Sequence, residues 1–201
     1  MSCPICDGTE WINMDHLRNV EYWRELDLLK RGEKVGFQVC AKCAFITYAN
    51  ILDPEAMKKN YSAQRKAVLS LNHVTCNRKN LMVRSFLGDR LNAWRDAGRT
   101  FLDVGCAQGS LLNMLAEDFR WDKKNILGTE WAESYAKFGK EIYGLDIISD
   151  PPPDRKFGVI SLFRVLEHMK EPQKELEKLS AMLEPGGYFF ISIPTWLDIL
   201  E

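Results

Sequence analysis

The stretch TFLDVGCAQGSLLNML, residues 100–115, decides the fold. An apolar run ends at Asp103, and two glycines, Gly105 and Gly109, follow before a helical pattern begins at Ser110. This order predicts a β-strand, a tight turn and the first turn of an α-helix. Glycine-rich turns of this kind bring the backbone close to a nucleotide-like cofactor at a helix N-terminus. We therefore expect a cofactor site at the end of this strand.

Short apolar runs alternate with amphipathic segments from Thr100 onward. The predicted strands are Phe101–Val104, Ile126–Thr129, Asp146–Ser149, Gly158–Phe163 and Tyr188–Ile193, and the predicted helices are Ser110–Glu117, Ala132–Tyr143 and Gln173–Leu183. The sequence EPGG, Glu184–Gly187, is expected to stop the last helix, and DPPPD, Asp150–Asp154, to form a stiff loop. Alternating strands and helices predict an α/β fold, with a Rossmann-like, doubly wound and mostly parallel sheet.

The second predicted strand ends at Glu130, followed by Trp131. A dinucleotide site would show G-x-G-x-x-G, but the middle glycine is missing from Gly105-Cys-Ala-Gln-Gly109. A carboxylate at position 130 can accept hydrogen bonds from both ribose hydroxyls, and the indole can cover an adenine. We expect Glu130 to have no packing purpose, which favours a binding role.

These motifs, with GVISLFRVLEHMKEPQKELEKLSAMLEPGGYFFISIPT, resemble the class I S-adenosylmethionine-dependent methyltransferases over about residues 100–195. The resemblance implies contacts to the methionine end, the ribose and the adenine of S-adenosylmethionine. The implied cofactor-binding residues are Asp103, Gly105, Cys106, Gly109, Glu130, Trp131, Asp150 (or its neighbour Ile148) and Phe163. Phe163 and Arg164 would face the reactive end of the cofactor. The chain departs from the family at Gly158, where an Asp is usual, and at Ala107, where a Gly is usual.

Two Cys-x-x-Cys pairs, Cys3 with Cys6 and Cys40 with Cys43, predict a four-thiolate zinc site. Such a closed site would hold the fold of an N-terminal zinc-ribbon-like module and leave no position for catalysis. Disulfides are the alternative, and the absence of a secretion leader counts against them. A four-cysteine module, the segment KKNYSAQRK and a class I core resemble a methyltransferase group that includes sugar C-methyltransferases. In that group the second knuckle continues with Gly, whereas Ala44 stands here.

Residues 56–99 carry ten Lys or Arg against two Asp. Such a segment can bind phosphate, RNA or an acidic substrate, or it can be a solvated helical face. The segment has few aromatic residues, which weakens the RNA interpretation. Apolar residues at three- and four-residue steps predict one buried helical stripe made of Leu81, Phe86, Leu87, Leu91 and Trp94.

Methyl transfer needs a base when the acceptor must lose a proton, and His168 is the best candidate for that base. The alternative is a helix-start histidine that packs or forms hydrogen bonds. Arg164 is a second candidate catalytic residue. Tyr61 and Arg65 would either line a lid over the cofactor or belong to a plain surface helix. His16 and His73 stand in no pattern that indicates a role.

The 201 residues are 46% hydrophobic with a formal charge of −1, and no window holds the roughly 18 apolar residues of a membrane span. We expect a cytoplasmic protein with a zinc module over 1–50, a helical linker or lid over 51–99 and a methyltransferase core over 100–201. That core would be incomplete, since two further strands are usual. The predicted function is methyl transfer from S-adenosylmethionine to a small-molecule acceptor, for which a sugar nucleotide is one candidate. The alternatives are an RNA methyltransferase and a non-catalytic cofactor-binding scaffold.

Overall fold

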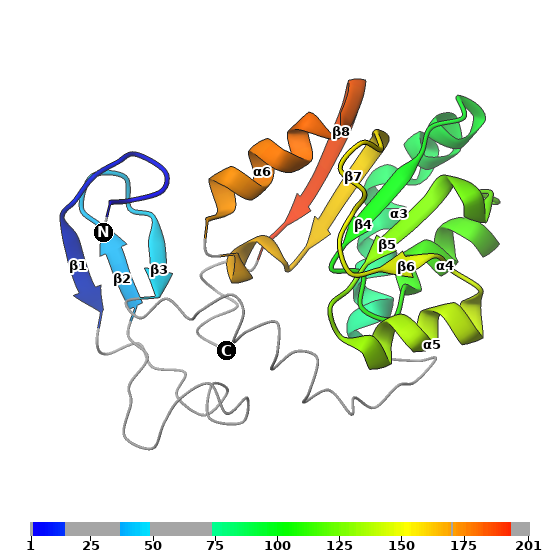
Figure 1. The fold of residues 1–201 in the computed structure, drawn as a ribbon, viewed down its shortest axis with the longest axis horizontal. Helices are drawn as coiled ribbons and strands as arrows, with labels where there is room; N and C mark the ends of the chain where they lie inside the picture. The colour runs from blue at the N-terminus through cyan, green and yellow to red at the C-terminus, as the bar shows by residue number, and fades with distance from the viewer. Residues whose placement is uncertain (1, 15–36, 49–73, 170, 194–201) are drawn as a thin grey trace. The chain divides into compact units, whose positions relative to one another are not determined.

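The computed structural model describes residues 2–14, 37–48, 74–169 and 171–193, which fall into two compact units (Figure 1). Each unit has its own sheet and is described by itself. Tyr61, Arg65, His16 and His73 lie outside the described residues. None of the described helices combines the length and the apolar composition that a bilayer crossing needs.

The first unit holds a three-stranded antiparallel sheet, β1 (Trp11–Met14), β2 (Phe37–Cys40) and β3 (Ile46–Tyr48), in that spatial order. Trp11 pairs with Cys40, and Val39 pairs with Ile46. Each Cys-x-x-Cys pair forms a turn beside this sheet, one before β1 and one at the end of β2. The sheet therefore brings two cysteine turns together that are far apart in the sequence.

The second unit is a Rossmann-like α/β fold around a five-stranded parallel sheet in the order β6-β5-β4-β7-β8 (Figure 1). Its helices and strands are α3 (Val74–Asp96), β4 (Phe101–Val104), α4 (Ser110–Glu117), β5 (Ile126–Thr129), α5 (Glu133–Tyr143), β6 (Ile147–Ile148), β7 (Phe157–Phe163) and β8 (Leu183–Ser192). Helix α6 (Pro172–Ala181) precedes β8, and its residues up to Leu176 group with the first unit. Short 3-10 turns cover Lys123–Asn125 and Leu166–His168. The fold class predicted from the sequence is confirmed.

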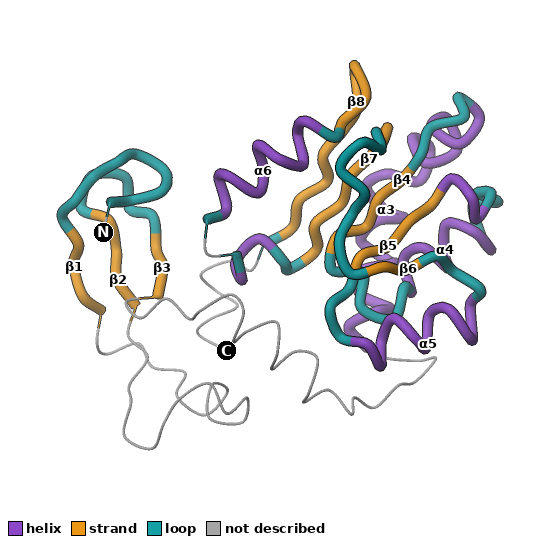
Figure 2. The backbone as a smooth tube through the Cα atoms, in the orientation of Figure 1, coloured by secondary structure: helices purple, strands orange, loops and turns teal. Residues whose placement is uncertain are grey.

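The chain reverses its direction of travel across the sheet between β6 and β7. It runs outward from β4 through β5 to β6 and then returns to the other side of β4. Residues 149–156, which include DPPPD, make this return as a loop without a helix (Figure 2). The reversal leaves a topological switch point between β4 and β7, where ligands bind in sheets of this type.

The start of β8 differs from the prediction. The strand begins at Leu183 rather than Tyr188, so the EPGG sequence lies within the strand. The pairing with β7 is irregular between Phe157 and Val159, because the partner of Phe157 is Leu183 and the partner of Val159 is Tyr188. Gly186 has a φ of 69°, and a Cβ on Gly187 would lie 2.9 Å from the Glu184 carbonyl oxygen. The two glycines therefore lie at this irregularity within β8 and do not separate helix from strand.

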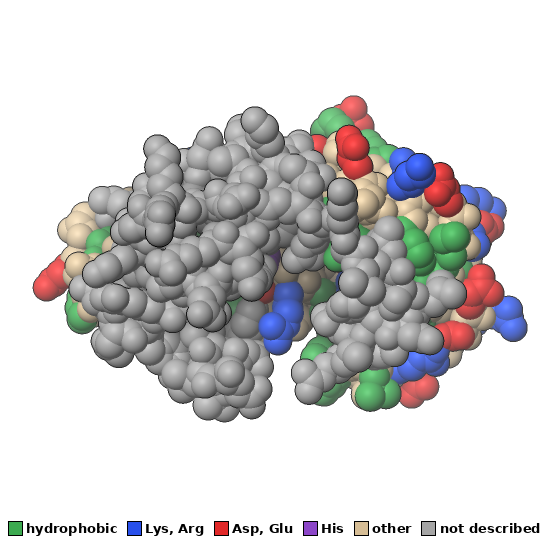
Figure 3. Space-filling model, turned by 90° about the horizontal axis from the view of Figure 1, so that it is seen from below, with side chains coloured by type: hydrophobic (Ala, Val, Ile, Leu, Met, Phe, Trp, Pro, Cys, Tyr) green, Lys and Arg blue, Asp and Glu red, His purple; other side chains and the backbone are tan. Residues whose placement is uncertain are grey.

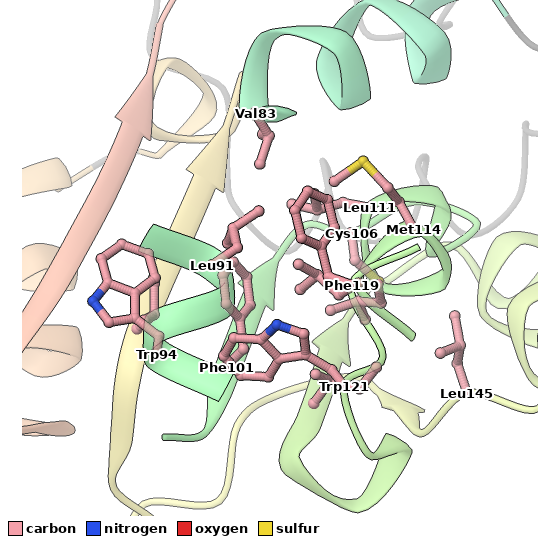
Figure 4. Close-up of a cluster of buried hydrophobic side chains, with 14 of the residues drawn as sticks. Val83, Leu91, Trp94, Phe101, Cys106, Leu111, Met114, Phe119, Trp121 and Leu145 are labelled. Carbon is pink, nitrogen blue, oxygen red and sulfur yellow. The ribbon is translucent and has the colours of Figure 1, made fainter. Parts of the chain in front are cut away.

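Helices α3 and α4 cover one face of the sheet with apolar side chains (Figure 4). The predicted α3 stripe is partly wrong. Leu91 and Trp94 are buried and Leu87 packs against the core, but Leu81 and Phe86 are 65% and 73% exposed. Val83 is buried instead, since positions 83, 87, 91 and 94 share one helical face.

The glycine at position 158 has a packing reason. A Cβ there would lie 2.8 Å from the Cβ of Arg99, which is close to the backbone and cannot move aside. We expect Gly158→Ala to lower the free energy of unfolding by about 1–3 kcal/mol through overpacking, as measured by urea denaturation. The matched control is Gly88→Ala in α3, where a Cβ meets nothing within 4 Å. That change should stabilise by about 1 kcal/mol through helix propensity, and equal responses of the two variants would contradict the packing argument.

Candidate functional site

The turn after β4 requires glycine at both ends. Gly105 and Gly109 have φ values of 64° and 81°, in the left-handed region that favours glycine. A Cβ on Gly105 would lie 2.5 Å from Val165 Cγ2, and one on Gly109 would lie 2.6 Å from Leu145 Cδ1. The space beside Gly105 is thus occupied by the loop after β7, and the turn is clamped between neighbouring parts of the sheet unit.

Ala107 adopts a φ of 51°, the left-handed conformation for which the family uses glycine. A Cβ in this region costs about 1–2 kcal/mol. We expect Ala107→Gly to raise the free energy of unfolding by about 1 kcal/mol, measured by urea denaturation. Ala93→Gly, at an exposed position in α3, should lower it by about 1 kcal/mol. A similar loss in both variants would show that Ala107 is unstrained.

Glu130 links the turn to α5. One carboxylate oxygen, Oε2, accepts a hydrogen bond from Ala107 N at 3.0 Å, and Oε1 accepts one from Ala132 N at 2.8 Å. The expectation that this carboxylate has no packing purpose is therefore wrong, because it fixes the glycine turn against the start of α5. Each carboxylate oxygen has a second lone pair, so Glu130 can still accept hydrogen bonds from a ribose.

Asp103 at the end of β4 has no exposed surface. Its Oδ1 accepts a hydrogen bond from the Ser161 hydroxyl at 2.7 Å, and its Oδ2 lies 2.8 Å from Lys79 Nζ. Ser161 is on β7 and Lys79 is on α3, so three elements meet at this carboxylate. Asp103 therefore lies at the switch point, as the resemblance implies, but its side chain is enclosed by protein groups.

Lys79 is a site residue that the sequence interpretation missed. Its ammonium lies 4.7 Å from the ring centroid of Phe163, which is buried at the end of β7 and packs on Phe190 of β8. In the sequence Lys79 is one of ten basic residues in a polar segment, and nothing in its spacing separates it from the others. Only the position of α3 beside β4 and β7 identifies it.

Cys106 points away from the ligand side of the turn. Its side chain is 3% exposed and lies in the core cluster (Figure 4), where its sulfur fills the space that a Cβ on Gly128 would take. Burial, together with the negative charge of Asp103, raises the pKa of the Cys106 thiol well above its ordinary value. A cofactor contact by this residue would therefore come from its backbone.

The residues expected around the adenine are more open. Trp131, directly after Glu130, is 41% exposed, and Asp150 is exposed in the loop after β6. Ile148 is the last residue of β6, and its carbonyl oxygen accepts a hydrogen bond from Glu130 N. The sheet thus places Glu130, Trp131 and Ile148 at one end of the neighbouring strands β5 and β6.

The two candidate catalytic residues lie in the loop after β7. Arg164 is exposed, has a φ of 51° and donates its backbone N–H to the Ser192 carbonyl. His168 is half-buried and ends the 3-10 turn that follows. Burial raises the pKa of the Glu167 carboxyl in the same turn, although the charge of Arg164 opposes the shift. Val165, from this loop, contacts Gly105, so the loop borders the glycine turn.

Several basic residues in α3 and just after it make ion pairs with the protein itself. Arg84 pairs with Asp118, Arg95 pairs with Asp96, and Arg99, just after the helix, lies 3.8 Å from Glu184. Acidic and basic side chains are interspersed where the described surface is visible in Figure 3. Within the described residues, this mixture of charges does not favour an RNA-binding face, which would be a patch of mainly positive side chains.

The four predicted zinc ligands come together in the first unit. Their Sγ atoms all lie within 4.8 Å of one another, with Cys3 to Cys43 and Cys6 to Cys40 both at 3.6 Å. Sulfurs around a tetrahedral zinc are about 3.8 Å apart, since each Zn–S bond is about 2.3 Å. The donor set and the spacing therefore fit a zinc ion.

The two cysteine turns have the same backbone geometry. Asp7 N donates to Cys3 O, and Ala44 N donates to Cys40 O, both at 2.9 Å. Asp7 and Ala44 have φ values of 58° and 59°, so the position that usually holds glycine keeps its left-handed conformation without one. Burial opposes ionisation of Cys40, but backbone N–H groups of Cys43 and Lys42 lower its pKa to about 7.

Comparisons with known proteins agree with this geometry. The family described as "Methyltransferase domain" matches residues 77–198, more than half of the chain. The ubiquinone biosynthesis O-methyltransferases of Candida albicans (mitochondrial) and Marinobacter nauticus are 34% identical over 108 residues and 26% identical over 110. Each match covers 48% of this chain, and they cover 33% and 44% of the relatives, so the chain spans less than half of their length.

A solved structure shares the fold. The amino pentose methyltransferase CalS10 of Micromonospora echinaspora, with S-adenosylmethionine bound, aligns with a TM-score of 0.50 at 20% identity. The alignment covers 63% of this chain and 58% of that protein.

Proposed function

The chain belongs to the methyltransferase-domain family, and from this premise we propose that it transfers a methyl group from S-adenosylmethionine to a small-molecule acceptor. The observation that carries the proposal is the link between Glu130 and Ala107, which joins the ends of β5 and β4. This hydrogen bond joins the glycine turn, which would hold the methionine end, to the strand end that would hold the ribose. A single adenosyl ligand would contact both parts, whereas a dinucleotide would need a further glycine.

The residues that would hold the cofactor follow from this arrangement. Gly105 and Gly109 would present backbone groups to the methionine end, Glu130 would accept the ribose hydroxyls, and Trp131 would cover the adenine. When bound, S-adenosylmethionine supplies an electrophilic methyl group on a sulfonium, which an acceptor atom takes by in-line displacement. The protein would contribute alignment and exclusion of water from this step.

The loop after β7 would receive the acceptor. Phe163 ends β7 at the switch point, and Arg164 and His168 follow in the loop that contacts Gly105 through Val165. An acceptor hydroxyl or amine must lose a proton, and His168 is the proposed base. Arg164, whose side chain is exposed, would orient a negatively charged group of the acceptor.

The first acceptor class to test is sugar nucleotides. The order of a four-cysteine module before the core supports this choice, as does the name of the structural neighbour, an amino pentose methyltransferase. A small phenolic acceptor is the second class, because the curated relatives are named for ubiquinone biosynthesis.

Calorimetry with S-adenosylmethionine and S-adenosylhomocysteine, followed by transfer of a labelled methyl group to an acceptor panel, tests the proposal. Binding and turnover with a small molecule are expected. Methylation of RNA with salt-sensitive binding would favour the RNA alternative. Cofactor binding without any turnover would favour the scaffold, and no cofactor binding would overturn the assignment.

We also propose that Cys3, Cys6, Cys40 and Cys43 bind one structural Zn²⁺. The four Sγ atoms, which lie within 4.8 Å of one another, support the site. All four positions would be filled by protein, so the metal would stabilise the three-stranded sheet and take no part in methyl transfer.

A further inference from the structure

The ion pair of Lys79 and Asp103 has one enclosed and one accessible member. The Asp103 side chain is 0% exposed and the Lys79 side chain is 16% exposed. Both oxygens of Asp103 already accept hydrogen bonds, from Ser161 and from Lys79. A ligand at the switch point would therefore meet the ammonium before it met the carboxylate.

The ammonium of Lys79 retains donors for a ligand. It carries three N–H groups, and among the described residues Asp103 is the acceptor for one of them. The Phe163 ring, at 4.7 Å from Nζ, attracts the cation through its π face and takes no conventional hydrogen bond. Asp103 and Phe163 thus hold a partly exposed cation, and two of its three N–H groups have no acceptor among the residues that the structure describes.

We propose that Lys79 binds the carboxylate at the amino-acid end of the cofactor and that Asp103 is the positioning residue for Lys79. This inference rests on the proposed function, and it adds a side-chain contact from Lys79 at the methionine end to the backbone contacts of the glycine turn. A carboxylate is the group of the cofactor whose charge complements an ammonium, and a charge-assisted hydrogen bond between them is strong in a partly buried site. The cationic α-ammonium of the cofactor would be turned away from Lys79 by like-charge repulsion.

The same arrangement explains why a basic residue of α3 is needed at this point. A buried carboxylate without its partner is strongly unfavourable, because its charge loses hydration and gains nothing in return. Lys79 neutralises Asp103 and also offers its remaining donors to the ligand. Arg84, five residues further along α3, pairs instead with the exposed Asp118.

Two ligands separate this contact from the rest of the site. S-adenosylhomocysteine carries the amino-acid end, whereas 5′-methylthioadenosine has the same adenosine and no carboxylate. We expect Lys79→Met to weaken binding of S-adenosylhomocysteine by about tenfold or more. Binding of 5′-methylthioadenosine should stay within about twofold of the wild type. Arg84→Met is the matched control and should leave both affinities unchanged.

A second variant covers the case in which Lys79→Met does not fold. Lys79→Met combined with Asp103→Asn removes both charges, so no unpaired charge is buried, and it should show the same selective loss by calorimetry on the full chain. Equal weakening of both ligands, or no change in either, would overturn the assignment of Lys79. If the wild-type chain bound neither ligand, the proposed function would fall and this inference with it.

Discussion

Chelation of the proposed zinc ion is expected to unfold the three-stranded sheet of the first unit and to leave the five-stranded sheet folded. The three strands have only 3–4 residues each, and a sheet of this size cannot bury enough apolar surface to be stable alone. Apparent binding free energies of structural zinc reach about 10–16 kcal/mol in small zinc modules, and that energy is folding energy. Hydrogen exchange measured by mass spectrometry should show lost protection at residues 2–14 and 37–48 after chelation.

The matched pair of variants for this prediction is Cys40→Ser and Cys106→Ala. Cys40 lies in the cluster, and Cys106 is a buried cysteine outside it. Elemental analysis should find one zinc per chain in the wild type and in Cys106→Ala, and a strongly reduced content in Cys40→Ser. Zinc retained at one per chain in Cys40→Ser, or unchanged protection after chelation, would contradict the four-thiolate site.

The glycine turn shows what local sequence predicts well. The strand Phe101–Val104 and the helix Ser110–Glu117 have the predicted boundaries, because an apolar run, two glycines and a helical pattern each act within a few residues. The cysteine cluster can be predicted in the same way, because two Cys-x-x-Cys turns that share one metal must lie close together. In both cases the residues that form each motif are only a few positions apart in the sequence.

Features that depend on distant partners escape such an interpretation. The role of Lys79 depends on Asp103, which is 24 positions away, and on Phe163. The exposure of Leu81 and Phe86 depends on which side of α3 meets the sheet. The irregular pairing at Gly186 and Gly187 depends on β7, because a glycine pair after a helix has the same sequence when it belongs to a strand. The packing reason for Gly158 likewise lies in Arg99.

Replacement of Glu130 by Ala is expected to have the largest effect on cofactor binding. The variant loses the acceptor of Ala107 N and of Ala132 N, so the glycine turn and the start of α5 are no longer joined. It also loses the proposed partner of the ribose hydroxyls. The affinity for S-adenosylhomocysteine should fall by about 1–3 kcal/mol, the cost of leaving such groups unpaired. Glu133→Ala, at an exposed position in the first turn of α5, is the matched control and should bind as the wild type does.

A loss of affinity alone would not distinguish a ribose contact from a displaced turn, so the ligand must be varied as well. The 2′-deoxy analogue of S-adenosylhomocysteine lacks one hydroxyl and should bind the wild type more weakly by about 1 kcal/mol. If Glu130 accepts that hydroxyl, the penalty for the analogue should vanish in Glu130→Ala, because the coupling between the two groups has been removed. An unchanged penalty would mean that Glu130 only holds the turn. The ribose would then have to be bound by another residue.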